Sequence, residues 1–315
     1  MLRFLRAFLL ASLLIGLGCG GKRGATGIAV DPAFTRLIPP DTEVLAGVRI
    51  DRLKDSAFYK RHEDQLNIPA IDEFSERAGI DPRRDLSGLL IAWNGKRPVV
   101  MARGRFAQDE VERKLSSLGA RQSAYKKYVL FGTGQDSLVF VSKGVAVGGS
   151  PGTLHSVIDI LDEKQGGVPD ELEQRLAALP KEDQIWAVSR QGLPFADMPM
   201  RSDIRSALSN IVGFVSAASV AIGVDTGTHL DMEIACVSDQ GAQRVRDALK
   251  GGIGLARLAT NDNELDLLRL YDSIQVDQEQ QVIHVRADLA GDLSDRLLAR
   301  LPQIESRAGQ ALRKR

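Results

Sequence analysis

The sequence predicts an α+β protein built from two similar units, each an antiparallel sheet packed by amphipathic helices. Short runs in which apolar residues alternate are joined by tight turns, and runs with helical spacing follow them. Such short connections favour antiparallel sheets over a parallel βαβ array. The same order of elements occurs twice along the chain, which indicates an internal duplication.

Each unit is predicted to begin with a turn rich in proline and acid, followed by a strand that ends at an arginine. In the first half the turn is 37–41 and the strand 44–49; in the second half they are 179–183 and 185–190. Glycines and a proline near residues 163–169 mark the joint. We assign residues 37–165 to the first unit and 170–302 to the second, and whether they share one sheet stays open.

The rest of the first unit is predicted from the same alternation of apolar and helical spacing. A hairpin is expected across Asn94-Gly95, and a helix is expected to start near Asp109. A further helix is expected to begin after Ser150. The strands that flank these features are predicted at 89–93, 98–106, 128–131, 137–142 and 144–147, and additional helices at 51–66 and 71–78.

The second unit repeats this order. Ser238 or Asp239 is expected to cap a helix in which Ala242, Val245, Leu249 and Ile253 share one face. A second amphipathic helix is expected at 204–215. The predicted strands are 219–224, 229–237, 273–276 and 282–287, a last helix carries Leu293 to Leu301, and residues 303–315 form a basic tail.

The first residues have the features of a secretory signal peptide. Two arginines, Arg3 and Arg6, precede an apolar run over residues 7–17, and small residues follow it. The run has about a dozen residues, whereas a membrane-spanning helix needs about 20. We therefore interpret residues 1–18 as a leader and the glycine-rich residues 19–36 as a flexible tether.

The cysteine that directly follows the leader indicates a lipid anchor. Gly18-Cys19 resembles the lipobox of bacterial lipoproteins, in which the cysteine is acylated and becomes the new N-terminus. The sequence departs from that pattern at Gly16, where a larger aliphatic residue is expected, and at Leu17, where a small one is usual. Lipidation of Cys19 is the prediction; plain secretion and an uncleaved anchor are the alternatives.

Composition narrows the classes of function. Forty-one basic and 41 acidic residues balance, so the net charge gives no case for nucleic-acid binding. With Cys19 acylated, Cys236 has no disulfide partner, and its apolar surroundings favour a buried, unreactive thiol. The four histidines (His62, His155, His229 and His284) stand singly, without metal-ligand spacing, so the sequence predicts neither a metal site nor a cofactor.

The sharpest enzyme hypothesis rests on Ser150. Gly148-Gly149-Ser150-Pro151-Gly152 fits the G-x-S-x-G pattern of a nucleophile elbow between a strand and a helix. Pro151 argues against it, because the residue after the nucleophile must offer an N–H to the oxyanion and proline has none. We interpret Ser150 as a helix N-cap with Pro151 in the first turn.

The body also carries a wider resemblance. Four motifs of the body resemble those of a group of bacterial exported lipoproteins of unknown function. They are Leu37-Ile-Pro-Pro-Asp-Thr42, Ala78-Gly-Ile-Asp-Pro-Arg-Arg-Asp85, Ala102-Arg-Gly-Arg-Phe106 and Val147-Gly-Gly-Ser150. In that group a duplicated α+β unit follows a signal peptide or lipobox. The resemblance covers mainly residues 37–160 and implies no activity.

These observations predict an exported, membrane-anchored protein of the cell envelope, on the periplasmic face or the outer membrane. Its expected role is non-catalytic binding or scaffolding, with the membrane reached through an acyl chain on Cys19 and an envelope protein as partner. A carrier or sensor of an apolar ligand is the alternative, and a serine hydrolase that uses Ser150 is a third possibility. No catalytic residue is assigned.

Overall fold

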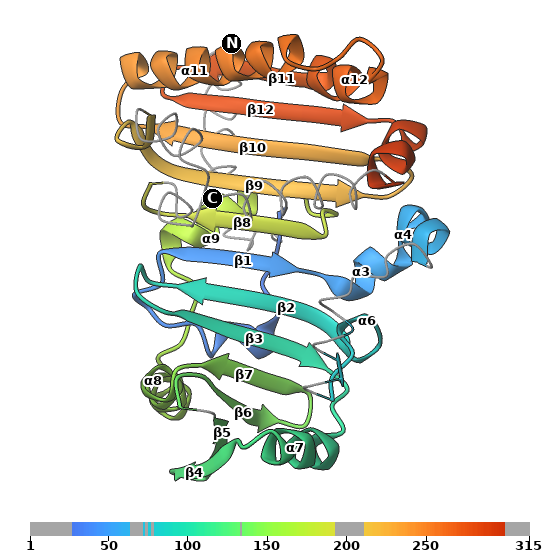
Figure 1. Cartoon of the computed structure of the whole chain (residues 1–315). Coiled ribbons are helices and arrows are strands. Elements are labelled where there is room, and N and C mark those ends of the chain that lie inside the picture. The colour runs from blue at the N-terminus through green and yellow to red at the C-terminus, as the bar shows by residue number, and fades with distance from the viewer. Residues whose placement is uncertain are drawn as a thin grey trace, which may run out of the picture.

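The strands in the described part of the chain form one continuous sheet. The computed structural model describes residues 27–63, 72, 75–76, 79–132, 134–192 and 211–299. Within them lies a 12-stranded antiparallel sheet with the order β11-β12-β10-β9-β8-β1-β2-β3-β7-β6-β5-β4 (Figure 1). The predicted α+β class is confirmed, and the question of whether the halves share a sheet is answered: they do.

The two halves meet at a seam between their first strands. β1 (Val44–Val48) pairs antiparallel with β8 (Ile185–Ser189), which places Gly47 opposite Trp186. Outward from this seam the strand orders correspond, β1-β2-β3-β7-β6 on one side and β8-β9-β10-β12-β11 on the other. The two similar units therefore form one body joined across β1 and β8, and the β4–β5 hairpin is an addition to the first half.

The hairpin predicted across Asn94-Gly95 occurs, as the pairing of β2 with β3. In the first half the strands are β2 (Leu86–Trp93), β3 (Pro98–Gly104), β4 (Arg121–Tyr125), β5 (Tyr128–Gly132), β6 (Ser137–Ser142) and β7 (Val145–Gly149). In the second they are β9 (Val215–Val224), β10 (Thr228–Cys236), β11 (Ile274–Glu279) and β12 (Val282–Leu289). β4 escaped prediction because it is a polar edge strand without apolar alternation.

Helices surround the sheet. They are α2 (Pro32–Thr35), α3 (Ile50–Asp55), α4 (Ala57–His62), α6 (Pro82–Asp85), α7 (Gln108–Ser117), α8 (Pro151–Glu163), α9 (Asp170–Ala178), α11 (Asp239–Leu258) and α12 (Leu265–Ser273). Residues 291–299 are also helical. Ser238 caps α11 as predicted, because its hydroxyl accepts a hydrogen bond from the Gly241 N–H at 3.1 Å.

Two predicted helices differ from the structure. The expected helix over 51–66 is divided at Ser56, whose Oγ accepts the Tyr59 N–H at 3.1 Å and starts α4 as a new helix. Most of the expected helix over 204–215 lies outside the described residues, and Val215 begins β9 instead. α9 and α12 were not anticipated.

The apolar core changes face between the halves. Paired residues in neighbouring strands share a face, and the register carries one face from Leu45 through Val188 and Ser219 to Glu233. In the first half this face holds the largest core, under α8 and α9. In the second half the core lies on the other face, under α11, and consists mainly of Ile234, Ile283, Val276, Ala242 and Val245. The face that bears Glu233 is consequently polar there.

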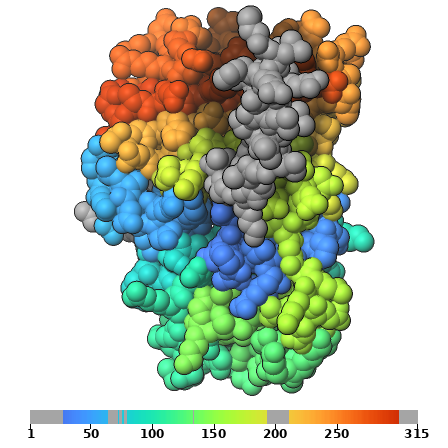
Figure 2. Space-filling model, turned by 180° about the vertical axis from the view of Figure 1, so that it is seen from behind, coloured from blue at the N-terminus to red at the C-terminus, as the bar shows by residue number. Residues whose placement is uncertain are grey.

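The folded body begins earlier than the sequence indicates. Residues 27–36, which we assigned to the tether, pack against the first-half core, where Ile28 and Phe34 are buried. The Ile28 N–H donates to the Leu176 carbonyl at 2.9 Å, which attaches this segment to α9. The two segments, blue and yellow-green, lie side by side on the back of the molecule (Figure 2). Any tether therefore has to precede Gly27.

Candidate functional site

The predicted anchor is not part of the described structure. Cys19, the leader and the basic tail 303–315 lie outside the described residues. Within the residues that are described, no helix combines the length and the apolar character that crossing a bilayer requires.

Ser150 occupies the position of a helix N-cap. It follows β7, and its Oγ accepts the Thr153 N–H at 3.3 Å and lies 2.7 Å from the Thr153 hydroxyl. Pro151 occupies the first position of α8, where a backbone N–H would have no acceptor within the helix, so proline costs no hydrogen bond. The local geometry is the one the cap interpretation predicts.

A shallow cleft of about 470 Å³ lies beside Ser150, lined among others by Asp41, Lys96 and Arg97. The described residues around it include no histidine, and Thr153 is the partner in the hydrogen bonds that the structure gives the Ser150 hydroxyl. A serine needs an adjacent base to act as a nucleophile. In the described part of the chain, then, the Ser150 hydroxyl is hydrogen-bonded to its capping partner Thr153, and no histidine lines the cleft beside it.

Cys236 is buried as predicted. It lies on β10 with only 4% of its surface exposed, in the core under α11. Burial in apolar surroundings raises the pKa of its thiol. The prediction of a small hydrophobic residue is thus confirmed by its position.

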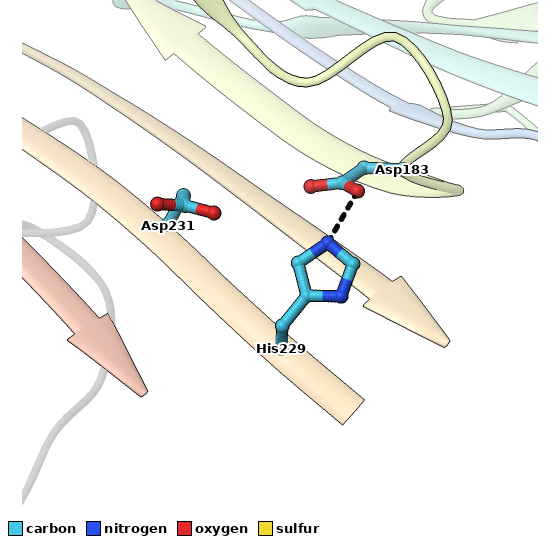
Figure 3. A group of neighbouring side chains, drawn as sticks. All are labelled: Asp183, His229 and Asp231. Carbon is cyan, nitrogen blue, oxygen red and sulfur yellow. Dashed lines mark hydrogen bonds and ion pairs between the residues drawn. The ribbon is translucent and has the colours of Figure 1, made fainter. Parts of the chain in front are cut away.

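The structure brings together three side chains that sequence reasoning kept apart: Asp183, His229 and Asp231 (Figure 3). Asp183 lies in the turn that enters β8. His229 and Asp231 lie two apart on β10 and so point to the same face of the sheet. One ligand atom from each residue lies within 4.8 Å of those of the other two.

Gly223 lets His229 reach Asp183. β9 lies between β8 and β10, and Gly223 is the β9 residue opposite His229. A Cβ at Gly223 would stand 2.6 Å from Asp183 Oδ1 and closer still to the imidazole. The ring therefore passes over a strand position that only glycine leaves open.

Asp183 is the buried member of this cluster, with 1% of its surface exposed. Its Oδ1 lies 2.6 Å from His229 Nε2, whereas its Oδ2 is buried and has no hydrogen-bond partner among the described residues. Burial raises the pKa of the Asp183 carboxyl, and the hydrogen bond with His229 opposes that shift. The carboxylate is thus held out of water with one oxygen uncompensated.

Arginines fix the surroundings of the cluster. Arg49, at the end of β1, donates through Nη2 to the carbonyls of Lys181 and Asp183, at 2.5 Å for the former, and so holds the turn before β8. Arg286 on β12 lies opposite Asp231, with its Nε 3.6 Å from Asp231 Oδ1. The cluster is anchored from the first half of the chain and from the neighbouring strand.

A second feature lies on the helices that cover the β11 end of the sheet. Three leucines at the C-terminal end of α11 and the start of α12 are strongly exposed: Leu255 by 70%, Leu258 by 82% and Leu265 by 59%. We call them the leucine patch. α11 and α12 lie at the end of the sheet that carries β11 and β12 (Figure 1). An ion pair links them, with Arg257 Nε 2.7 Å from Asp272 Oδ1.

A cleft of about 520 Å³ lies at the seam, beside Gly47 and Trp186. The three arginines that line it have partners. Arg52 Nη1 lies 2.8 Å from Glu182 Oε2, Arg103 is paired with Asp31, and Arg49 binds the carbonyls named above. Lys181 is the remaining cationic residue among the described residues that line the cleft.

Comparison with known proteins identifies no family. No protein-family profile matches the chain, and no curated protein matches its sequence. Among solved structures, crystal forms I, III and IV of a protein named TP0453 are similar. Their TM-scores are 0.47, 0.49 and 0.47 and their identities 8%, 9% and 9%, over 86% of this chain and 96%, 99% and 97% of that one. A likeness this distant carries no argument about function.

Proposed function

We propose that this chain is a lipid-anchored protein of the cell envelope with a non-catalytic binding role, and that it docks a protein partner through the leucine patch. The observation that carries the binding role is the exposure of Leu255, Leu258 and Leu265, which stand at the end of α11 and the start of α12, two helices that are in contact. Single exposed leucines are ordinary on protein surfaces, but grouped ones mark interaction sites.

The charges around the patch favour a protein over an anionic lipid surface. Exposed side chains of both signs surround the leucines, with Arg257 and Arg269 balanced by Asp262 and Asp272. Helices that bind anionic membranes are rich in lysine and arginine on their polar side. An apolar centre within a mixed polar rim is the usual anatomy of a protein–protein interface.

The anchor is proposed from the leader. An acyl chain on Cys19 would keep the patch near the membrane surface and confine the search for a partner to the envelope. Cys19→Ser should release the protein in soluble form when cells are fractionated. A Cys19→Ser protein that stays membrane-bound would remove the lipid anchor from the proposal.

Site-specific photo-crosslinking in intact cells tests the docking surface. A photoreactive residue at Leu258 should give one discrete protein adduct, which disappears when Leu265→Asp is added. The matched control is Leu118, which is exposed by 51% at the far end of the sheet, after α7, and should give no such adduct.

Three results would count against this docking surface. They are lipid-only adducts at Leu258, no adduct at Leu258, and the same adduct from Leu258 and Leu118. Circular dichroism of the Leu265→Asp protein separates lost docking from lost folding.

A further inference from the structure

We propose that Asp183, His229 and Asp231 bind a divalent transition-metal ion. This site is independent of the proposed docking role. The three residues supply one imidazole nitrogen and two carboxylates, and their ligand atoms already lie within 4.8 Å of one another. Figure 3 shows the carboxylate of Asp183 and the ring of His229 facing each other, with Asp231 beside them on the same strand as His229.

The second observation that points to a ligand is the unpartnered oxygen of Asp183. Only 1% of the surface of Asp183 is exposed. Its Oδ2 is buried and has no hydrogen-bond donor among the described residues. An uncompensated buried carboxylate oxygen is costly. A cation held between Asp183 and Asp231 would compensate it.

The donor set selects the class of ion. An imidazole ligand suits zinc, iron, nickel and copper, whereas magnesium and calcium prefer all-oxygen sites. Metal–nitrogen and metal–oxygen bonds to zinc are about 2.0–2.2 Å. His229 Nε2 and Asp183 Oδ1 are 2.6 Å apart, so they need to separate by only a few tenths of an ångström to admit an ion.

Solvent can reach the ion from one side. The side chains of His229 and Asp231 are 40% and 37% exposed, while that of Asp183 is buried. Three protein ligands leave coordination positions open to water or to a ligand. The ion would also link the turn before β8, which Arg49 holds from the first half, to β10 in the second half.

Metal titration of the purified full-length protein tests the site. After treatment with a chelator and its removal, isothermal titration with ZnCl₂ should give one ion per chain, and the Tm should rise with zinc. His229→Gln and Asp231→Asn should each weaken zinc binding by more than about 100-fold, since even outer residues of metal sites change affinity by 10–100-fold. Glutamine can still donate to Asp183, which keeps that carboxylate partnered in the variant.

His284→Gln is the matched control. His284 lies on the neighbouring strand β12 on the same face, next to Glu233, and zinc binding should survive its loss. With cobalt, weak ligand-field bands without an intense thiolate band are expected, because Cys236 is not a ligand. No saturable zinc binding, equal losses in His229→Gln and His284→Gln, calcium binding as tight as zinc binding, or a thiolate band would each overturn the assignment.

Discussion

The seam between the halves gives the sharpest test of the fold. Gly47 on β1 lies opposite Trp186 on β8. A Cβ placed on Gly47 would stand 2.5 Å from Cε2 and 2.9 Å from Nε1 of the Trp186 indole, and closer still to Cζ2. Trp186 is only 5% exposed and packs in the first-half core, so any movement of the indole breaks contacts in that core. Gly47→Ala must therefore displace the indole or part the two strands.

The change in the free energy of unfolding that Gly47→Ala causes is the sum of two opposing effects. Overpacking a filled core costs about 1–3 kcal/mol. Replacing glycine by alanine in a strand returns about 0.5–1 kcal/mol, because the unfolded chain loses conformational freedom. We expect the free energy of unfolding of Gly47→Ala to fall by about 1–2 kcal/mol.

A double-mutant cycle isolates the contact. Wild type, Gly47→Ala, Trp186→Leu and the double variant are unfolded in urea and followed by far-UV circular dichroism, since Trp186→Leu removes a fluorophore. Because leucine lacks the indole atoms that the new methyl meets, Gly47→Ala should cost much less in the Trp186→Leu background. Equal costs in both backgrounds, or a Gly47→Ala protein as stable as wild type, would refute the seam geometry.

Three further predictions concern single residues. Ser150→Ala should lower the free energy of unfolding by about 0.5–2 kcal/mol through loss of the α8 cap. The wild-type protein should not react with a fluorophosphonate probe. Labelling of the wild type that Ser150→Ala abolishes would restore the hydrolase hypothesis. A hydrogen bond from Lys126 lowers the pKa of Asp159, and the Asp159 carboxylate also accepts a hydrogen bond from the Tyr125 hydroxyl at 3.0 Å. These contacts stabilise the β4–β5 hairpin. The stabilisation is fully present above the unfolded-state pKa of an aspartate, and it is lost as the pH falls through the lowered folded-state pKa. Asp159→Asn should thus speed amide exchange in β4 and β5 at neutral pH, with a difference from wild type that vanishes in acid; an unchanged difference would contradict this. Cys236 in a Cys19→Ser protein should resist alkylation until denaturant is added, because burial protects the thiol and raises its pKa, and rapid native labelling would argue against that burial.

Much of the fold could be predicted from local pattern. The hairpin across Asn94-Gly95 and the capped helix after Ser238 follow from residues close in sequence, and both occur. The division at Ser56 was missed, because helical spacing continues through it although its hydroxyl begins a new helix. The change of core face between the halves was also missed, since it depends on strand register across the seam, which no local pattern specifies.

The candidate sites were less predictable for the same reason. Asp183 and His229 are brought together by the pairing of β8, β9 and β10, and by a glycine whose role appears only when the strands are aligned. Asp183 was part of the predicted proline–acid turn and His229 was noted as a single histidine. The alternation of His229 and Asp231 along one strand was the only local signal. No local sequence signal marked the leucine patch, because leucines at helical spacing predict a buried helix face, and only the fold shows that this face is left uncovered.

The central position of the seam shapes how the chain can reach its native state. β1 emerges early and pairs at once with β2 nearby in sequence, but its other edge waits for β8, which belongs to the second half. Pairing between distant segments is slow. Until β8 arrives, a nearly complete first half presents an open strand edge, a template for pairing with another molecule. The species most exposed to misassembly is therefore the half-folded chain, and crowding of nascent molecules should matter more for its yield than the stability of the finished sheet.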